Sequence, residues 1–247
     1  MKSHILYFLI FTSTFFMTYC STSVSSRDRD TLLDGLIAYY PFESSVNDTT
    51  EFKLNGINHS CDYEEAIIGN GIRLNGIDSW VEIPHDSLFN STEKSIQFWF
   101  YKSNGFIHDT PNTWDVEGLI FKSFDTHSYR DFSFQIANQE PPFNIGFQTI
   151  GPDSSYSCGQ LSSIQPNQWY HIIGIINETD ISLYINGDLV NSKAIANDIV
   201  NTEAPIVIGK ASYYSYPTRF FNGIIDELRL YNRALTEEEI KLLCTLR

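Results

Sequence analysis

Short apolar stretches that alternate with polar residues recur along most of this 247-residue chain. The interval from one stretch to the next is about 8 to 13 residues, which is typical of an all-β sandwich and argues against helices. Asn186-Gly187 joins two of the stretches and is a strong signal for a β-hairpin. The predicted strands lie within 36–42, around 57, and within 69–84, 95–101, 119–122, 132–136, 143–147, 166–176, 181–190, 207–209 and 220–231.

The composition favours one folded domain that does not bind nucleic acid. Apolar residues make up 42% of the chain and aromatic residues 15%, which is enough for one large core. The chain has 30 acidic and 16 basic residues, a net charge of −14, and no cluster of lysine and arginine. Because binding to a phosphate backbone needs a basic surface, nucleic acid is excluded as a partner.

The N-terminal residues 1–20 have the pattern of an export signal. Lys2 and His4 precede an apolar run over 5–17, which is shorter than the roughly 20 residues of a membrane-spanning helix. The Ser/Thr-rich and then charged segment 21–34 is predicted to be a tether. We therefore expect the domain over 35–247 to be exported, either to the cell surface or into the medium.

Two ways of processing the signal remain open. Met17-Thr18-Tyr19-Cys20 resembles a bacterial lipobox, in which Cys20 would carry a lipid. Ser21-Thr22-Ser23 offers small residues that suit an ordinary signal peptidase. Contact with a membrane is expected only through a lipid on Cys20.

The stretch 220–240 is predicted to close the fold as strand, turn and helix. Strand alternation places Asp226 on the same face as Leu228 and Leu230, which we expect to be buried. A buried carboxylate needs backbone donors, a cation or both. Thr236 and Glu239 have the spacing of a capping box that begins a short acidic helix.

This closing stretch also carries a family resemblance. Gly223-x-x-Asp226-Glu227 is followed by Arg229, Tyr231, Arg233-Ala234-Leu235 and the acidic helix. Together they resemble the closing signature of the laminin-G-like domains of the concanavalin A-like lectin/glucanase superfamily. The resemblance implies an all-β jelly-roll sandwich of two antiparallel sheets with a short C-terminal helix.

The resemblance further implies a structural calcium. In family members calcium is often held between the opening loop and the closing strand, and the matching positions are Asp48 and Asp226, with carbonyl oxygens from Gly76 and Asp78. Carboxylate and carbonyl oxygens are the ligands that calcium prefers. Such an ion would stabilise the fold and would take no part in chemistry. The alternative is that Asp48 caps a turn and Asp226 accepts backbone N–H bonds.

Catalysis is not expected. Retaining glycosidases on this fold carry Glu-x-Asp-x-x-Glu on one strand, which places two carboxylates about 5 Å apart, and this spacing does not occur in the chain. The sequence also has no nucleophile-elbow, zinc-protease or P-loop motif. We therefore expect a non-catalytic domain that binds a glycan or an extracellular protein, and a glycoside hydrolase is the least favoured reading.

Aromatic side chains are the candidate ligand contacts, because their flat apolar faces match the C–H faces of sugar rings. The alternative for each is packing in the core or at the rim. If the ligand is a protein, the chain would instead be an adhesion module without sugar binding. The candidates are Trp80, Trp99, Trp114, Tyr213, Tyr214 and Tyr216.

Three cysteines follow the signal, namely Cys61, Cys158 and Cys244. In an exported chain we expect one disulfide and one free thiol, and the sequence does not decide among the three possible pairs.

Overall fold

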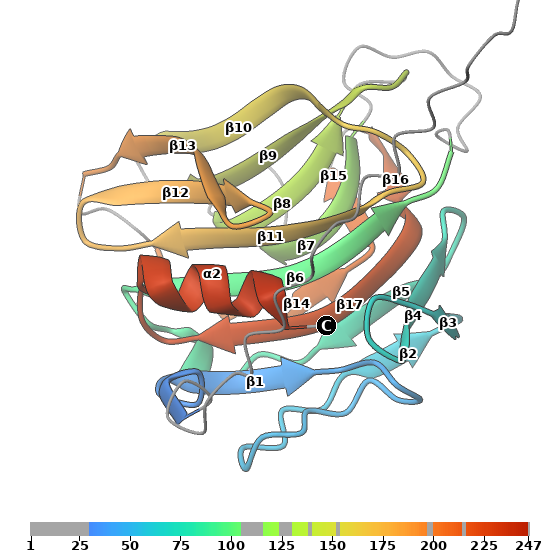
Figure 1. Cartoon of the computed structure of the whole chain (residues 1–247), viewed down its shortest axis with the longest axis horizontal. Helices are drawn as coiled ribbons and strands as arrows, with labels where there is room; N and C mark the ends of the chain where they lie inside the picture. Colours follow the sequence, from blue (N-terminus) through green and yellow to red (C-terminus); the bar gives the residue numbers. More distant parts are fainter. Residues whose placement is uncertain are drawn as a thin grey trace, which may run out of the picture.

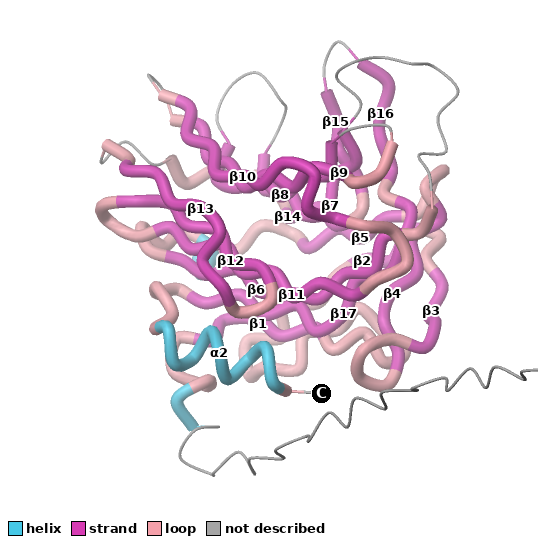
Figure 2. Tube along the Cα trace, turned by 45° about the horizontal axis from the view of Figure 1, so that its top comes forward, coloured by secondary structure: helices cyan, strands magenta, loops and turns pink. Residues whose placement is uncertain are grey.

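The fold is a sandwich of two antiparallel sheets, as predicted (Figures 1 and 2). The computed structural model describes residues 30–104, 116–123, 130–137, 140–151, 154–196, 200–213 and 216–246, with the backbone alone for 162, 212–213 and 216–219. One sheet, here called sheet A, has eight strands, and the other, sheet B, has seven. No helix in the described part of the chain is long and apolar enough to cross a membrane.

Sheet A holds the first and last strands of the domain. Its order is β13-β12-β11-β6-β17-β4-β3, and β1 also pairs with β17. The bounds are β1 Leu36–Tyr40, β3 Asp62–Glu65, β4 Asn70–Asn75, β6 Lys94–Lys102, β11 Trp169–Ile176, β12 Asp180–Ile185, β13 Asp188–Ala194 and β17 Asn222–Tyr231.

Sheet B lies opposite, in the order β10-β9-β8-β7-β14-β5-β2. A separate two-stranded hairpin, β15–β16, packs against β7. A short 3-10 helix, η1 (Ser87–Phe89), precedes β6. The bounds are β2 Ile57–His59, β5 Trp80–Ile83, β7 Val116–Ser123, β8 Arg130–Ala137, β9 Phe143–Ile150, β10 Ser155–Ile164, β14 Ile206–Ile208, β15 Lys210–Tyr213 and β16 Tyr216–Phe220.

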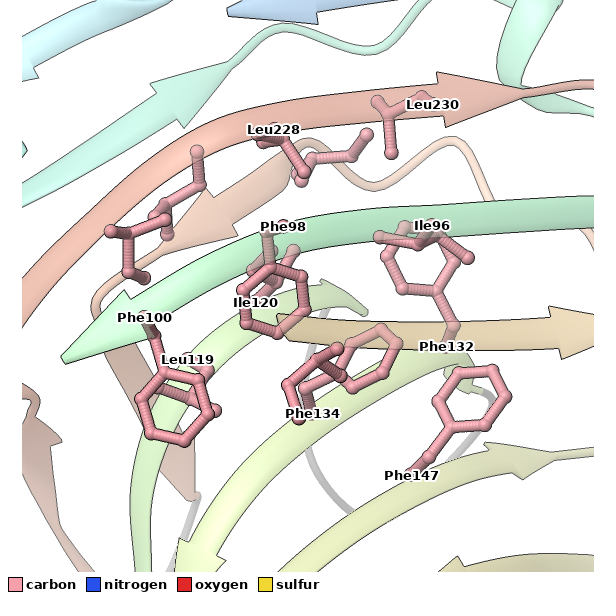
Figure 3. Close-up of a cluster of buried hydrophobic side chains, with 14 of the residues drawn as sticks. Ile96, Phe98, Phe100, Leu119, Ile120, Phe132, Phe134, Phe147, Leu228 and Leu230 are labelled. Carbon is pink, nitrogen blue, oxygen red and sulfur yellow. The ribbon is translucent and has the colours of Figure 1, made fainter. Parts of the chain in front are cut away.

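The core between the sheets is built from the alternate residues of each strand. On β6, Ile96, Phe98 and Phe100 face sheet B and are at most 1% exposed. The rings of Phe98 and Phe134 meet edge to face with their centres 5.1 Å apart (Figure 3). Such interdigitation of two apolar faces is what holds a sandwich together.

The stretch 69–84 forms two strands, and the prediction of one strand is wrong. Residues 70–75 form β4 of sheet A, whereas 80–83 form β5 of sheet B. Gly76, with φ of 76°, begins the turn that carries the chain from one sheet to the other. Only glycine adopts this left-handed backbone without cost.

Other local predictions are confirmed. Asn186 and Gly187 have φ of 53° and 87°, as a tight hairpin turn between β12 and β13 requires. Thr236 and Glu239 form the predicted capping box at the start of helix α2, Glu237–Thr245. The predictions omitted β3, β10 and the hairpin β15–β16.

Helix α2 covers one half of the outer face of sheet A (Figure 1). Ile240 and Leu243 of the helix pack on Ile173 and Tyr231 of the sheet, together with Leu32 from the start of the domain. Thr31, Leu242 and Thr245 line one surface hollow beside the helix. The first and last described segments of the domain therefore lie together.

A bulge in β17 changes which face Asp226 occupies. The register of β17 with β6 shifts between Asp226 and Arg229, and Glu227 in between has φ of 56°. Leu228 and Leu230 therefore point into the core (Figure 3), whereas Asp226 lies opposite Trp99 on the outer face of sheet A. Asp226 is buried, as predicted, but it does not share a face with the two leucines.

Candidate functional site

One row of outward-facing residues crosses all seven strands of sheet B. Their neighbours along the strands, such as Val81 and Phe147, lie in the core, so the row is on the face away from sheet A. We call it the outer row. From β2 to β10 the strand register aligns Ile57, Glu82, Val207, Phe121, Ser133, Gln148 and Ser157.

Arg130 lies across the outer row and orders it. Its Nη1 donates to Ser133 Oγ at 3.2 Å and to Gln148 Oε1 at 2.8 Å. The guanidinium carbon lies 5.4 Å from the centre of the Phe121 ring. Gln148 Nε2 in turn donates to Ser157 Oγ at 3.3 Å. These bonds hold the Gln148 amide in one orientation across three strands, as a preformed polar site requires.

A second row, beside the outer row, has almost no side chains. It consists of Gly118, Gln135, Gly146 and Gly159, in register across β7 to β10, and we call it the glycine row. Among the described residues, a Cβ at Gly146 would meet only the Gln135 side chain, at 3.6 Å. In the described part of the chain the face is therefore open at Gly146, and the partly exposed residues Gln135 and Gln148 lie close to it.

The hairpin β15–β16 borders this open surface. At Gly118 a Cβ would lie 2.6 Å from the backbone nitrogen of Ala211, so the absence of a side chain lets β15 pack directly on β7. The hairpin thus stands over one end of the glycine row.

Carboxylates are sparse on this face. Among the described residues of the outer row and the glycine row, Glu82 is the only acid. Asp131 of β8 turns inward and pairs with Lys94 and Lys122. Because a retaining glycosidase needs two carboxyl groups about 5 Å apart, the described part of this face offers binding groups and no hydrolytic pair.

Trp99 takes the packing alternative and is buried, so it is not an exposed ligand contact. Its side chain is 2% exposed, and its ring centre lies 4.8 Å from that of His171. On the outer face of sheet A it stands between His171 of β11 and Asp226 of β17, which shield it on both sides.

The other aromatic candidates remain predictions. Trp114 and Tyr214 lie outside the described residues, and Tyr213 and Tyr216 of the hairpin are described by their backbone alone. The last two pair with each other at the turn end of the hairpin, whose β15 packs on β7 at Gly118.

Trp80 is covered on both faces of its indole. The His59 ring stacks on it with centres 3.9 Å apart and 5° between the planes. Lys210 Nζ lies 4.1 Å from the ring centre, and it must lie on the opposite side because the imidazole fills the first. This arrangement leaves no open face of Trp80 for a sugar.

The Asp48 carboxylate caps the opening loop. Its Oδ1 accepts the N–H groups of Tyr39 at 3.0 Å and Thr50 at 2.9 Å. Its Oδ2 accepts the Leu54 N–H at 3.0 Å and the Thr50 hydroxyl at 2.7 Å. A carboxylate has about four lone-pair positions, and here four donors occupy them. This is the turn-capping alternative of the sequence analysis.

The Asp226 carboxylate accepts N–H bonds from Ile68 at 3.1 Å and Glu227 at 2.8 Å. Burial raises the pKa of Asp226 to about 7, and the charges of Glu227 and Glu43 act in the same direction. The sequence analysis missed Glu43, whose carboxylate accepts the Asn70 N–H at 3.0 Å. The contact joins the opening loop to the start of β4, and a local pattern does not reveal it.

The four residues implied for calcium lie in three parts of the fold: the opening loop, the turn after β4, and β17. Tyr39 directs its N–H to Asp48 on the edge of β1 that faces away from β17. Gly76 and Asp78 follow the end of β4 that pairs with Asn222. Within the described ranges, no three side chains of metal-binding type come together. Calcium at these residues therefore stays a prediction.

The three cysteines of the domain form no disulfide with one another, so the expected disulfide is wrong for this structure. Cys61 and Cys158 are buried in the core, and burial raises the pKa of their thiols to about 12 and about 11. Cys244 lies on α2, beside the turn at Gly187. Buried thiols with a raised pKa are poor nucleophiles.

A family model described as the concanavalin A-like lectin/glucanases superfamily matches residues 75–241, more than half of the chain. The chain belongs to the concanavalin A-like lectin/glucanase superfamily. One relative of the chain is Paraclostridial mosquitocidal protein 1 from Paraclostridium bifermentans, which is 35% identical over 83 residues. That match spans 32% of the chain and 6% of the relative's length.

Two solved structures show the same superfamily fold. Domain 4 of AbnA, a GH43 extracellular arabinanase from Geobacillus stearothermophilus, was solved in complex with arabinotriose. It is 23% identical, with a TM-score of 0.68, and the match covers 85% of this chain and 98% of that one. The second structure is of botulinum neurotoxin type C, whose cell entry is described as dependent on interaction with two ganglioside molecules. It is 15% identical, with a TM-score of 0.69. Here the match covers 87% of this chain and 52% of the other.

Proposed function

We propose that this chain is a non-catalytic glycan-binding module and that the glycan binds on the outer face of sheet B. The bound sugar would lie over the glycine row at Gly146, within reach of the amides of Gln135 and Gln148. The hydrogen-bond chain from Arg130 through Gln148 to Ser157 carries the proposal. Amide groups held in place beside an open stretch of backbone offer hydrogen-bond donors and acceptors to sugar hydroxyls. Such groups need no rearrangement when the sugar binds.

The superfamily relatives support a saccharide ligand. The arabinanase domain was solved with arabinotriose, and the neurotoxin structure is described in terms of gangliosides. These are properties of those proteins. They bear on this chain only because the fold is shared and because its face has polar groups suited to the same class of ligand.

We further propose that the module acts outside the cell, as the export pattern of residues 1–20 suggests. It would be attached through a lipid on Cys20 or released after ordinary cleavage. The helix α2 covers the other side of the sandwich, so attachment through the segment before residue 30 would leave the glycine row accessible.

The test is a glycan array probed with the wild-type domain, followed by isothermal titration with the best ligand. We expect Gln148→Ala to weaken binding about tenfold, the loss of one well-placed pair of hydrogen bonds. Gln165→Ala, at an exposed glutamine before β11, is the matched control and should bind normally. If the domain binds no glycan on the array but captures extracellular proteins, the adhesion alternative is favoured. If it releases sugar from a glycan, a hydrolase is favoured.

A further inference from the structure

Trp169 and Tyr101 form a partly exposed aromatic pair on the outer face of sheet A. They lie opposite each other on β11 and β6, with their ring centres 5.6 Å apart and 51° between the ring planes. Helix α2 covers the other half of this face, over Ile173 and Tyr231 (Figure 1). The aromatic pair is therefore at the end of sheet A that α2 leaves uncovered.

Asn167 fixes the turn beside the aromatic pair. Its N–H donates to the Lys102 carbonyl at 2.7 Å, and its Oδ1 accepts the Tyr101 hydroxyl at 3.3 Å. Its φ is 60°, a left-handed conformation that asparagine tolerates better than most residues. The Nδ2 of this exposed side chain donates to no residue in the described ranges. Two rings and one amide are thus held in fixed positions.

The charge next to the aromatic pair is already neutralised. Along the same register Ile224 lies beside Tyr101, and Arg73 lies beside Ile224. The Arg73 guanidinium donates to Asn222 Oδ1 at 3.0 Å and pairs with Glu64 at 3.3 Å. An anionic ligand would have to compete with these partners and with a net charge of −14 on the chain.

We propose that Trp169, Tyr101 and Asn167 form a second saccharide site, which takes a neutral sugar ring. Aromatic rings match the C–H face of a sugar, and the adjacent amide can bond its hydroxyls. The inference takes its ligand class from the proposed function but rests on different residues. Because the site lies on the opposite face of the sandwich from the glycine row, one domain would bind two glycan chains.

The test is isothermal titration of the full domain with arabinotriose, xylotriose, cellotriose and maltotriose. For the trisaccharide that binds, we expect a stoichiometry of about two per domain, one for each face. Trp169→Ala and Asn167→Asp should each weaken one of the two sites about tenfold. Asn167→Asp keeps a residue that tolerates the left-handed turn, so it tests the site even if Trp169→Ala folds poorly.

Matched variants separate this inference from the proposed function. Leu189→Ala, at an exposed apolar residue on the distant strand β13, should leave both sites unchanged. If Gln148→Ala has no effect while Trp169→Ala removes all binding, the proposed function fails and the inference stands. If Gln148→Ala alone abolishes binding, or if no trisaccharide responds to Trp169→Ala and Asn167→Asp, the second site does not exist.

Discussion

Lys102 and Glu117 join the two sheets through a buried ion pair. Nζ of Lys102 on β6 lies 3.2 Å from Oε2 of Glu117 on β7, and both side chains are 0% exposed. At the opposite end of β6, Lys94 pairs with Asp131 of β8 at 2.5 Å. These ion pairs fix how sheet A lies on sheet B at both ends of a central strand.

Removing both partners of the Lys102–Glu117 pair should cost less than the sum of the two single removals. Lys102→Met and Glu117→Gln should each lower the free energy of unfolding by about 3–5 kcal/mol, because the remaining group is left buried without its partner. The double variant Lys102→Met/Glu117→Gln should lose clearly less than the sum of the two. Urea unfolding measures each value, and strictly additive losses would contradict the coupling.

Gly174 and Gly146 provide a matched pair of glycine substitutions. A Cβ at Gly174 would lie 2.4 Å from Phe134 Cζ and 2.8 Å from Phe147 Cζ in the core. Gly174→Ala should therefore destabilise the domain by about 1–3 kcal/mol. Gly146→Ala, on the open face, should change stability by less than about 0.5 kcal/mol but weaken glycan binding. Thermal unfolding and titration measure the two effects, and equal destabilisation would contradict this assignment of faces.

Asp226 should make the domain less stable as the pH rises. Its folded pKa of about 7 is above the ordinary value of 3.8, so the native state retains a proton that the unfolded state releases. The free energy of unfolding should fall by about 1–3 kcal/mol between pH 4 and 7 from this group. Asp226→Asn should flatten that slope in part, since burial also raises the pKa of Glu117 to about 7. If the pH dependence of the unfolding free energy is the same in Asp226→Asn as in the wild type, Asp226 is not its cause.

The same variant tests the calcium prediction. A cation bound at Asp226 would stabilise the ionised carboxylate, so calcium should raise the melting temperature most at pH 8. Asp226→Asn should lose that response. Identical melting of the wild type in calcium and in EDTA at pH 6 and pH 8 would show that the ion does not bind.

Arg233 connects the start of the domain to its final helix. It donates to the carbonyls of Thr31 at 3.1 Å and Asp34 at 2.9 Å, and it contacts both oxygens of Glu239 at 2.7 and 2.8 Å. Lysine cannot reproduce this fork. Arg233→Lys should therefore speed hydrogen exchange over 31–35 and 237–245 and destabilise the domain by about 1–2 kcal/mol. Lys241→Ala, which removes an exposed pair at 4.0 Å, is the control and should have little effect.

The fold was largely predictable because its signals are local. Strand alternation, the turn at Asn186-Gly187 and the capping box of Thr236 each depend on a few adjacent residues. The bulge at Glu227 gives no such signal, because the residue that takes the positive φ is not glycine. The burial of Trp99 likewise depends on strands that are distant in the sequence.

The candidate site was not predictable for a related reason. Gly118, Gln135, Gly146 and Gly159 form a row only through the register of four strands, which sequence periodicity does not fix. Glycines within strands were a usable hint, since they often mark close approach of a backbone or a ligand. Arg130 carries no mark of its role in the sequence until Gln148 is placed beside it.

Thr31 and Thr245 line the same hollow beside α2, on the side of the sandwich opposite the glycine row. The polypeptide thus enters and leaves the domain at neighbouring points. A module built in this way can be inserted into a surface loop of another protein, or strung in series through short connectors, without distortion of either partner. In each arrangement the glycine row would point outward from the scaffold.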